Sequence, residues 1–284
     1  MTVVSSIPPA ARDRAPSIIH LLAAAVRRCW ESGAPKEFLR ALLRTVQTWF
    51  PGLVDAKYVT QRSICRVLRR PFGEEFRAVQ LLGLPAGALI LDVGANRGQS
   101  IDLRLVVPGR RVIAFEPNPL LVDRLRRHYA QRPEVDVRAI GLGDEAGVYT
   151  LHVPAYNGYV FDGLASFNEA AARGWLDGRL FGYKAANVRI HRVICGVKRL
   201  DDLGLAPSLI KLDVQGFELQ ALRGGRRTLE RYRPALLVEA PPDELVSYLN
   251  ELQYRPSRMD ISSKASETAR TLSFSLGSAA WWDG

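Results

Sequence analysis

From residue 89 onward, hydrophobic residues come in short runs that alternate with amphipathic stretches. Alternation of this kind predicts an α/β fold with a doubly wound, mostly parallel sheet. Strand-like runs occupy residues 89–93, 111–116, 135–140, 148–153, 188–194, 209–214 and 235–239. Helical periodicity marks residues 99–105, 119–129, 217–229 and 243–252. A hairpin formed by 253–256 and 271–276 is expected to close the sheet.

The N-terminal part of the chain has helical periodicity only. Its four expected helices span residues 17–31, 35–50, 59–68 and 74–82. Their aromatic residues either pack onto the sheet domain or line a substrate pocket, and a single apolar stripe favours packing. We therefore predict a helical N-terminal cap over residues 1–84 and a sheet domain over residues 85–284.

One long segment, residues 154–186, is rich in Gly and aromatic residues and has no clear period. Irregular stretches of this length inside a domain are usually lids or binding loops. We therefore expect this segment to cover a site.

Composition narrows the class of protein. The 284 residues carry a formal net charge of +10, but the arginines are scattered and form no basic stripe interleaved with aromatics. No nucleic-acid partner is therefore expected, while attraction to anionic lipid or an acidic substrate stays open. No apolar run approaches the roughly 18 residues that a transmembrane helix needs. Three widely spaced cysteines are typical of a reducing compartment, so we expect a cytoplasmic protein.

The first strand ends in a tight glycine turn, a sequence that builds a nucleoside-binding crevice at the edge of a parallel sheet. Gly94 and Gly98 bracket this turn, and Asn96 between them either caps the next helix or contacts a ligand. Asp92 stands directly before the turn, where its charge would repel a pyrophosphate. A cofactor with positive charge and no phosphate, such as S-adenosylmethionine, fits better.

The second and third strands supply further candidate cofactor contacts. Glu116 ends the second strand and can accept hydrogen bonds from both ribose hydroxyls, with Asn118 just after it. Its alternative role is to complement the dipole of the next helix. Leu142 and Asp144 follow the third strand, where an apolar side chain and a carboxylate suit adenine and its amine. A plain Gly-Asp hairpin turn is the alternative.

Candidate catalytic carboxylates follow the strand at 209–214. Asp213 lies where that strand meets the crevice, and Glu218 enters the next helix. Together they can orient or deprotonate a hydroxyl or hold a divalent ion, although nothing else in the sequence supports a metal. The alternatives are a dipole contact for Glu218 and an ion pair with Lys211 for Asp213. His191 and Glu239 are further candidate bases.

A series of motifs in shared order resembles the FkbM family of S-adenosylmethionine-dependent methyltransferases. The motifs occupy residues 91–98, 114–119, 141–144, 197–203, 210–218, 222–225 and 236–239. The resemblance implies a Rossmann-like methyltransferase sheet and O-methylation of small molecules or glycans, in natural-product, glycolipid or surface-polysaccharide pathways. Gln215 stands where the family often has Glu.

We therefore expect an S-adenosylmethionine-dependent O-methyltransferase whose partner is a small-molecule or glycan acceptor. The alternative within the same cofactor class is an RNA or protein methyltransferase, which the charge excess of residues 1–75 motivates. An NAD-dependent oxidoreductase is disfavoured by Asp92 and by the lack of a Gly-x-Gly-x-x-Gly turn. A non-catalytic binding module stays open.

Overall fold

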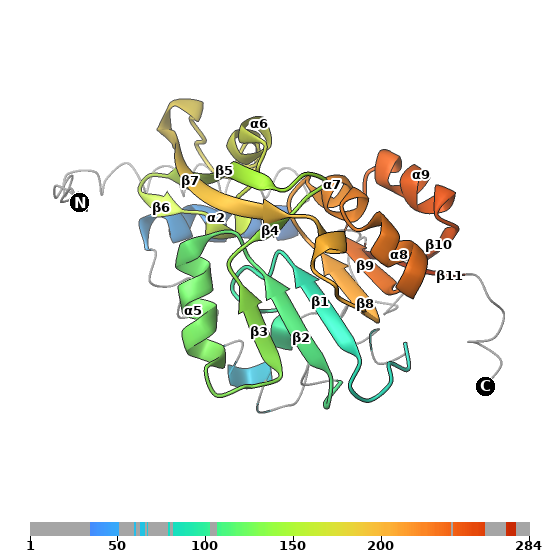
Figure 1. Cartoon of the computed structure of the whole chain (residues 1–284). Helices are drawn as coiled ribbons and strands as arrows, with labels where there is room; N and C mark the ends of the chain where they lie inside the picture. The colour runs from blue at the N-terminus through green and yellow to red at the C-terminus, as the bar shows by residue number, and fades with distance from the viewer. Residues whose placement is uncertain are drawn as a thin grey trace.

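The computed structural model describes residues 35–50, 60, 63–65, 67, 79, 82–102, 107–239, 241–258 and 271–276. Within these residues the strands form two sheets (Figure 1). The larger sheet has seven strands in the order β10-β11-β9-β8-β1-β2-β3. They are β1 Leu89–Val93, β2 Arg111–Phe115, β3 Val135–Arg138, β8 Leu209–Leu212, β9 Ala235–Glu239, β10 Tyr254–Arg258 and β11 Thr271–Leu276.

The larger sheet confirms the predicted doubly wound topology. Strands β3, β2, β1, β8 and β9 are parallel, and β10 and β11 form the expected antiparallel hairpin at one edge. The chain runs outward from β1 to β3 and then returns to the opposite side of β1 as β8. This reversal places a crevice at the carboxyl ends of β1, β2 and β8.

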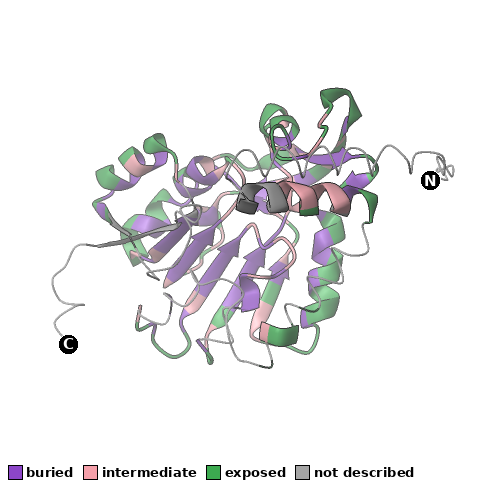
Figure 2. Ribbon diagram, turned by 180° about the vertical axis from the view of Figure 1, so that it is seen from behind, coloured by how far each residue is buried: buried purple, intermediate pink, exposed green. Residues whose placement is uncertain are grey.

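Helices cover both faces of this sheet, which explains why its strands read as nearly continuous apolar runs. On one face, α5 (Pro119–Tyr129) packs against the even-numbered residues of β1, including Ile90. On the other, α7 (Glu218–Arg223), α8 (Arg226–Tyr232) and α9 (Asp243–Glu251) pack against the odd-numbered residues. Figure 2 shows the central strands buried between these layers.

The second sheet corrects one expectation, because the runs at 148–153 and 188–194 do not join the main sheet. They lie within β5 (Gly147–Tyr156) and β7 (Val188–Lys198), which form a long antiparallel pair with β6 (Tyr159–Val160) and β4 (Gly141–Leu142) at the edges. Much of β7 is exposed, as in a sheet with one solvated face. This sheet lies across the carboxyl ends of the parallel strands (Figure 1).

Residues 157–187, here named the insert, connect β5 to β7. The predicted irregular segment contains short elements: β6, the 3-10 turn η3 (Asp162–Leu164), helix α6 (Glu169–Gly174) and the 3-10 turn η4 (Ala185–Asn187). Because both ends of the insert belong to the second sheet, it is held above the same edge of the main sheet.

Two predicted helices differ in the structure. The helix expected over 217–229 is split into α7 and α8, because a Cβ on Gly224 would overlap the carbonyl oxygen of Gly143. Of the helix expected over 99–105, residues 99–100 form a turn, residues 101–102 have 3-10 geometry, and residues 103–106 lie outside the described part.

Of the predicted N-terminal cap, the structure describes one complete helix, α2 (Pro35–Trp49). It packs against the insert: the backbone N–H of Phe181 donates to Thr45 Oγ1 at 2.9 Å, and the Arg44 guanidinium lies 5.3 Å from the Trp175 ring centroid. The helix expected over 17–31 lies outside the described residues, and those over 59–68 and 74–82 are described only at single positions. The division at residue 84 stays a prediction.

Within the described residues, none of the helices combines the length and the apolar character that crossing a membrane requires. Cys65 and Cys195 are free thiols in this part of the chain.

Candidate active site

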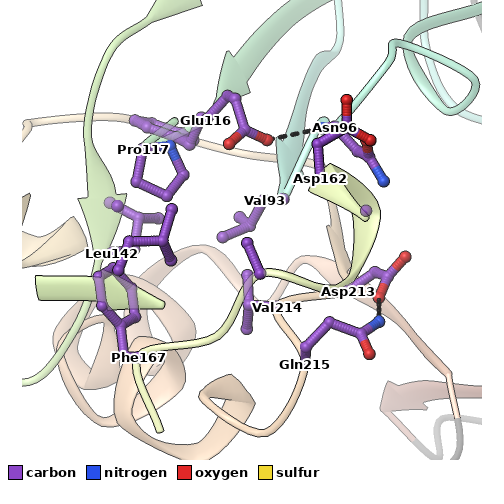
Figure 3. A pocket seen from close by; sticks show the side chains of 16 residues that line it. Val93, Asn96, Glu116, Pro117, Leu142, Asp162, Phe167, Asp213, Val214 and Gln215 are labelled. Carbon is purple, nitrogen blue, oxygen red and sulfur yellow. Dashed lines mark hydrogen bonds between the residues drawn. The ribbon is translucent and has the colours of Figure 1, made fainter. Parts of the chain in front are cut away.

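A crevice lies at the carboxyl ends of β1, β2 and β8, with about 560 Å³ of empty space when the solvent at its open mouth is included (Figure 3). Its walls come from the glycine turn after β1, the end of β2, β4, the turn after β8, and the insert. Figure 3 shows an apolar side at Leu142, Pro117 and Phe167 and a polar side at Asp213 and Gln215.

The glycine turn comes close to the turn after β8. Gly94 has φ of +80°, and a Cβ there would overlap the carbonyl oxygen of Asp213. Its backbone N–H donates to the carbonyl of Phe115 at 3.0 Å. This position therefore requires glycine, and the predicted turn lines the crevice as expected.

Asn96 lines the crevice from this turn. Its backbone N–H donates to Glu116 Oε2 at 2.8 Å, with φ of +49°. The side-chain Oδ1 is buried and accepts no hydrogen bond from the described residues. Of the two predicted roles, ligand contact is the one that this position suits, because a buried acceptor without a donor is costly unless a ligand supplies one.

Glu116 is 5% exposed and lines the crevice at the end of β2. Its Oε1 accepts from the backbone N–H of Asn118 at 2.9 Å and its Oε2 from that of Asn96. Burial raises the pKa of this carboxyl from 4.5 to about 7, although the two N–H donors oppose the shift. Each oxygen keeps a lone pair, so the carboxylate can still accept two hydroxyl hydrogen bonds.

Asp92 stands in β1 just before the glycine turn, as predicted, but it is not among the residues that line the crevice. It is fully buried: Ser100 Oγ donates to its Oδ2 at 2.6 Å, and Lys211 Nζ lies 3.2 Å from its Oδ1. Lys211 Nζ also donates to the carbonyl of Gly94 at 3.1 Å. Asp92 therefore holds the glycine turn and β8 together through Lys211. The Asp92 carboxylate could influence a bound cofactor only through this ion pair.

Three further predicted cofactor residues also lie outside the lining. Asn118 caps α5, where its Oδ1 accepts from the backbone N–H of Leu120 at 3.2 Å. Gly98 packs under α5, and Tyr129 Oη donates to its carbonyl at 3.0 Å. Asp144 lies in the turn between β4 and β5. The capping bond accounts for Asn118 and a φ of +85° for Gly98, while a cofactor contact of these residues stays a prediction.

Leu142 lines the apolar side of the crevice, as expected. Phe167 of the insert extends this wall and packs against Phe217, with ring centroids 4.8 Å apart. The result is a flat apolar surface beside the Glu116 carboxyl (Figure 3).

Asp213 lines the crevice where β8 ends, at the predicted position. Its side chain is 31% exposed, and its Oδ2 lies 3.9 Å from Lys211 Nζ. Gln215 Nε2 donates to its Oδ1 at 2.7 Å (Figure 3). The carboxylate is therefore oriented and within reach of a ligand.

The other candidate bases lie apart from Asp213. Glu218 lies inside the turn, where its Oε1 accepts from the backbone N–H of Val214 and its Oε2 from that of Gly216, each at 3.0 Å. His191 is exposed on β7 and is not a lining residue. The side chain of Glu239 lies outside the described part. The expected Asp213–Glu218 pair therefore does not converge on one ligand.

The insert contributes lining residues that sequence reasoning did not single out. Asp162, Gly163 and Ala165 lie over the crevice. Arg97 of the glycine turn binds Asp162 with two hydrogen bonds, Nε to Oδ1 at 3.1 Å and Nη2 to Oδ2 at 2.8 Å. In the sequence, the only indication was that this segment has no helical or strand periodicity. That absence predicted a segment over a site but did not identify the residues that line it.

The charge of the crevice favours a cationic ligand. Its described lining includes the carboxylates of Glu116, Asp162 and Asp213 and neither Lys nor Arg, although Arg97 pairs with Asp162 and Lys211 lies near Asp213 from outside the lining. A sulfonium or ammonium suits this lining better than a pyrophosphate does. No three His, Cys, Asp or Glu side chains of the described residues lie close enough together to hold a metal ion.

The fold and the crevice together define a nucleoside-cofactor enzyme of the methyltransferase class. Residues 92–256 match the family described as the methyltransferase FkbM domain, which is more than half of the chain. The chain belongs to this family.

The chain is similar to three further proteins, each over part of its length. The chain is 30% identical over 183 residues to the AMB antimetabolite synthetase AmbE of Pseudomonas aeruginosa, which covers 56% of this chain but only 8% of AmbE. It is 27% identical over 195 residues to the methyltransferase sdnD of Sordaria araneosa, covering 61% of this chain and 75% of sdnD. The crystal structure of methyltransferase FkbM from Methylobacillus flagellatus aligns with a TM-score of 0.44 at 20% identity, over 66% of this chain and 44% of that one.

Proposed function

We propose that the protein methylates a hydroxyl group of a small molecule or glycan. The observation that carries this proposal is the position of Asp213, a partly exposed carboxylate on the polar side of the crevice. A hydroxyl is a weak nucleophile until its proton is accepted, and a carboxylate at hydrogen-bonding distance can do this.

We assign the cofactor to the part of the crevice away from Asp213, because the side chains there match the groups of S-adenosylmethionine. Glu116 is positioned to accept the two ribose hydroxyls, and the wall of Leu142 and Phe167 suits the adenine ring. Asn96 Oδ1, buried without a donor, suits a polar hydrogen of the cofactor. The acidic lining matches the positive charge of S-adenosylmethionine.

When bound, S-adenosylmethionine supplies an electrophilic methyl group and leaves as a neutral thioether. The protein contributes alignment of the acceptor oxygen and exclusion of water, which the insert above the crevice provides. Asp213 accepts the proton that the hydroxyl loses as its oxygen forms the new C–O bond. Lys211, 3.9 Å from Asp213 Oδ2, stabilises the carboxylate before that transfer.

The relatives support a small-molecule acceptor, since AmbE is described as an antimetabolite synthetase. We place the reaction in the cytoplasm, because free thiols such as Cys65 and Cys195 suit a reducing compartment.

The test is a screen of hydroxylated small molecules and glycans with methyl-labelled S-adenosylmethionine, read by mass spectrometry. Asp213→Asn is expected to lower kcat by about 10²–10⁴ while leaving cofactor affinity nearly unchanged. Asp177→Asn, which alters an exposed carboxylate of the insert, is the matched control and should retain full activity. A labelled methyl group attached to nitrogen in the product would overturn the proposal. Label found only in RNA or protein would also overturn it.

A further inference from the structure

The turn that follows β8 is held from two sides. Gln215 has φ of +52°, a left-handed conformation that is uncommon for residues other than glycine. Below it, the Glu218 carboxylate accepts the backbone N–H groups of Val214 and Gly216. Above it, Ser166 Oγ of the insert donates to the carbonyl of Gln215 at 2.9 Å.

Ser166 is well placed to restrain this turn. It is 3% exposed, its Oγ accepts from the backbone N–H of Asn168 at 3.1 Å, and its backbone is paired with that of His152 on β5. The hydroxyl is thereby oriented so that its hydrogen is directed to Gln215. The insert and the turn after β8 are joined by a buried contact between residues 49 positions apart.

With its backbone restrained, Gln215 directs its side-chain amide at Asp213. The Nε2–Oδ1 distance of 2.7 Å is short for a hydrogen bond from a neutral donor and is typical of a charged acceptor. Both residues line the crevice. The amide therefore fixes the rotation of the carboxylate that the proposed reaction uses.

The charges around Asp213 make this amide donor important. From β8, Lys211 is shared with the buried Asp92 of β1. Glu116, which follows β2, and Asp162 of the insert line the same crevice, and Asp162 is paired with Arg97. Glu218 of α7 lies inside the turn after β8. Asp213 thus shares one cation with Asp92, and the Gln215 amide supplies a hydrogen-bond donor without adding a further charge.

We infer that Gln215 is a positioning residue, which orients Asp213 toward the acceptor hydroxyl, and that Ser166 couples this orientation to the insert. The inference rests on the proposed function. In this chain the neutral amide donates to Asp213, whereas the glutamate that the family often has here would place a second carboxylate against it.

The first experiment needs no acceptor. The side-chain amide resonances of Gln215 are assigned by NMR in the full-length protein through their loss in Gln215→Gly, which keeps the positive φ without strain. A proton bound to a carboxylate resonates downfield and exchanges slowly. Asp213→Asn and Ser166→Ala are each expected to shift the Gln215 amide resonance upfield and to speed exchange of its proton. Asp177→Asn should leave this resonance unchanged. An unchanged amide in both variants overturns the inference, whether or not the protein methylates hydroxyls.

The second experiment measures rates on the acceptor found in the screen. Gln215→Asn, too short to reach Asp213, is expected to lower kcat about tenfold with cofactor affinity within about threefold. Gln215→Glu is expected to move the acidic limb of the kcat–pH profile upward by about one unit. Gln253→Glu is the matched control, since Gln253 has φ of +62° and is exposed.

These outcomes separate the two proposals. Wild-type kcat and an unshifted acidic limb in both Gln215 variants overturn the positioning role while the methyltransferase proposal stands. A wild-type protein that methylates no hydroxyl, but whose Gln215 amide responds to Asp213→Asn, removes the proposed function and leaves the Gln215–Asp213 contact established.

Discussion

The buried Glu116 carboxyl makes the stability of the cofactor-free protein depend on pH. Burial raises its pKa from 4.5 to about 7. Between these values the folded state retains a proton that the unfolded state has released, so protonation stabilises the fold below pH 4.5 and this contribution is lost as pH rises through 7. At about 1.4 kcal/mol per pKa unit, the free energy of unfolding falls by about 3 kcal/mol over this range.

The assay is urea unfolding followed by tryptophan fluorescence at pH 5, 6, 7 and 8. Other groups also titrate here, so the wild type is compared with Glu116→Gln, which has a similar size and cannot ionise. The wild type is expected to lose stability relative to the variant as pH rises, by about 2–3 kcal/mol between pH 5 and 8. Parallel stability profiles would refute the reasoning.

Cofactor affinity should show the opposite trend. Hydroxyl donors and a nearby cation favour the ionised carboxylate, so binding of S-adenosylmethionine lowers the Glu116 pKa. Its affinity is therefore expected to increase about tenfold from pH 5.5 to 7.5, measured by calorimetric titration. Glu116→Gln should bind more weakly and show little of this dependence, and an equal pH dependence in both proteins would contradict the assignment.

Three substitutions test other parts of the structure. Gly94→Ala should cost several kcal/mol and prevent cofactor binding, because its Cβ overlaps the Asp213 carbonyl; a thermal melt close to that of the wild type would contradict this. Lys211→Met leaves Asp92 buried without its cation and should lower the free energy of unfolding by about 3–5 kcal/mol, read by urea denaturation. His191→Ala should retain kcat within about twofold on the identified acceptor, since this side chain is exposed outside the crevice; a large loss would return it to the list of bases.

The main sheet was predictable because its signals are local. The apolar runs at 89–93 and 209–214 are continuous, as expected of parallel strands covered on both faces, and the structure contains strands there. Glu116 and Asp213 could be placed at the crevice because parallel strands end at the same edge. Asp92 satisfied the same rule and yet does not line the crevice, since strand position does not reveal that a buried lysine pairs with it.

The second sheet and the insert were not predictable in this way. The runs at 148–153 and 188–194 were recognisable as strands, but which sheet they join depends on pairing between segments distant in the chain. The contacts of Arg97 with Asp162 and of Ser166 with Gln215 span 65 and 49 residues and leave no periodic signal.

The sequence by itself determined the doubly wound sheet, the glycine turn and the carboxylates at the strand ends, because hydrophobic periodicity and turn chemistry act over a few residues. Only the tertiary structure decided that Asp92 and Glu218 have internal partners, that His191 lies outside the crevice lining, and that the insert contributes to that lining. Hydrogen bonds and ion pairs form between whichever groups the fold brings within about 3 Å, and that proximity is a property of the folded chain as a whole.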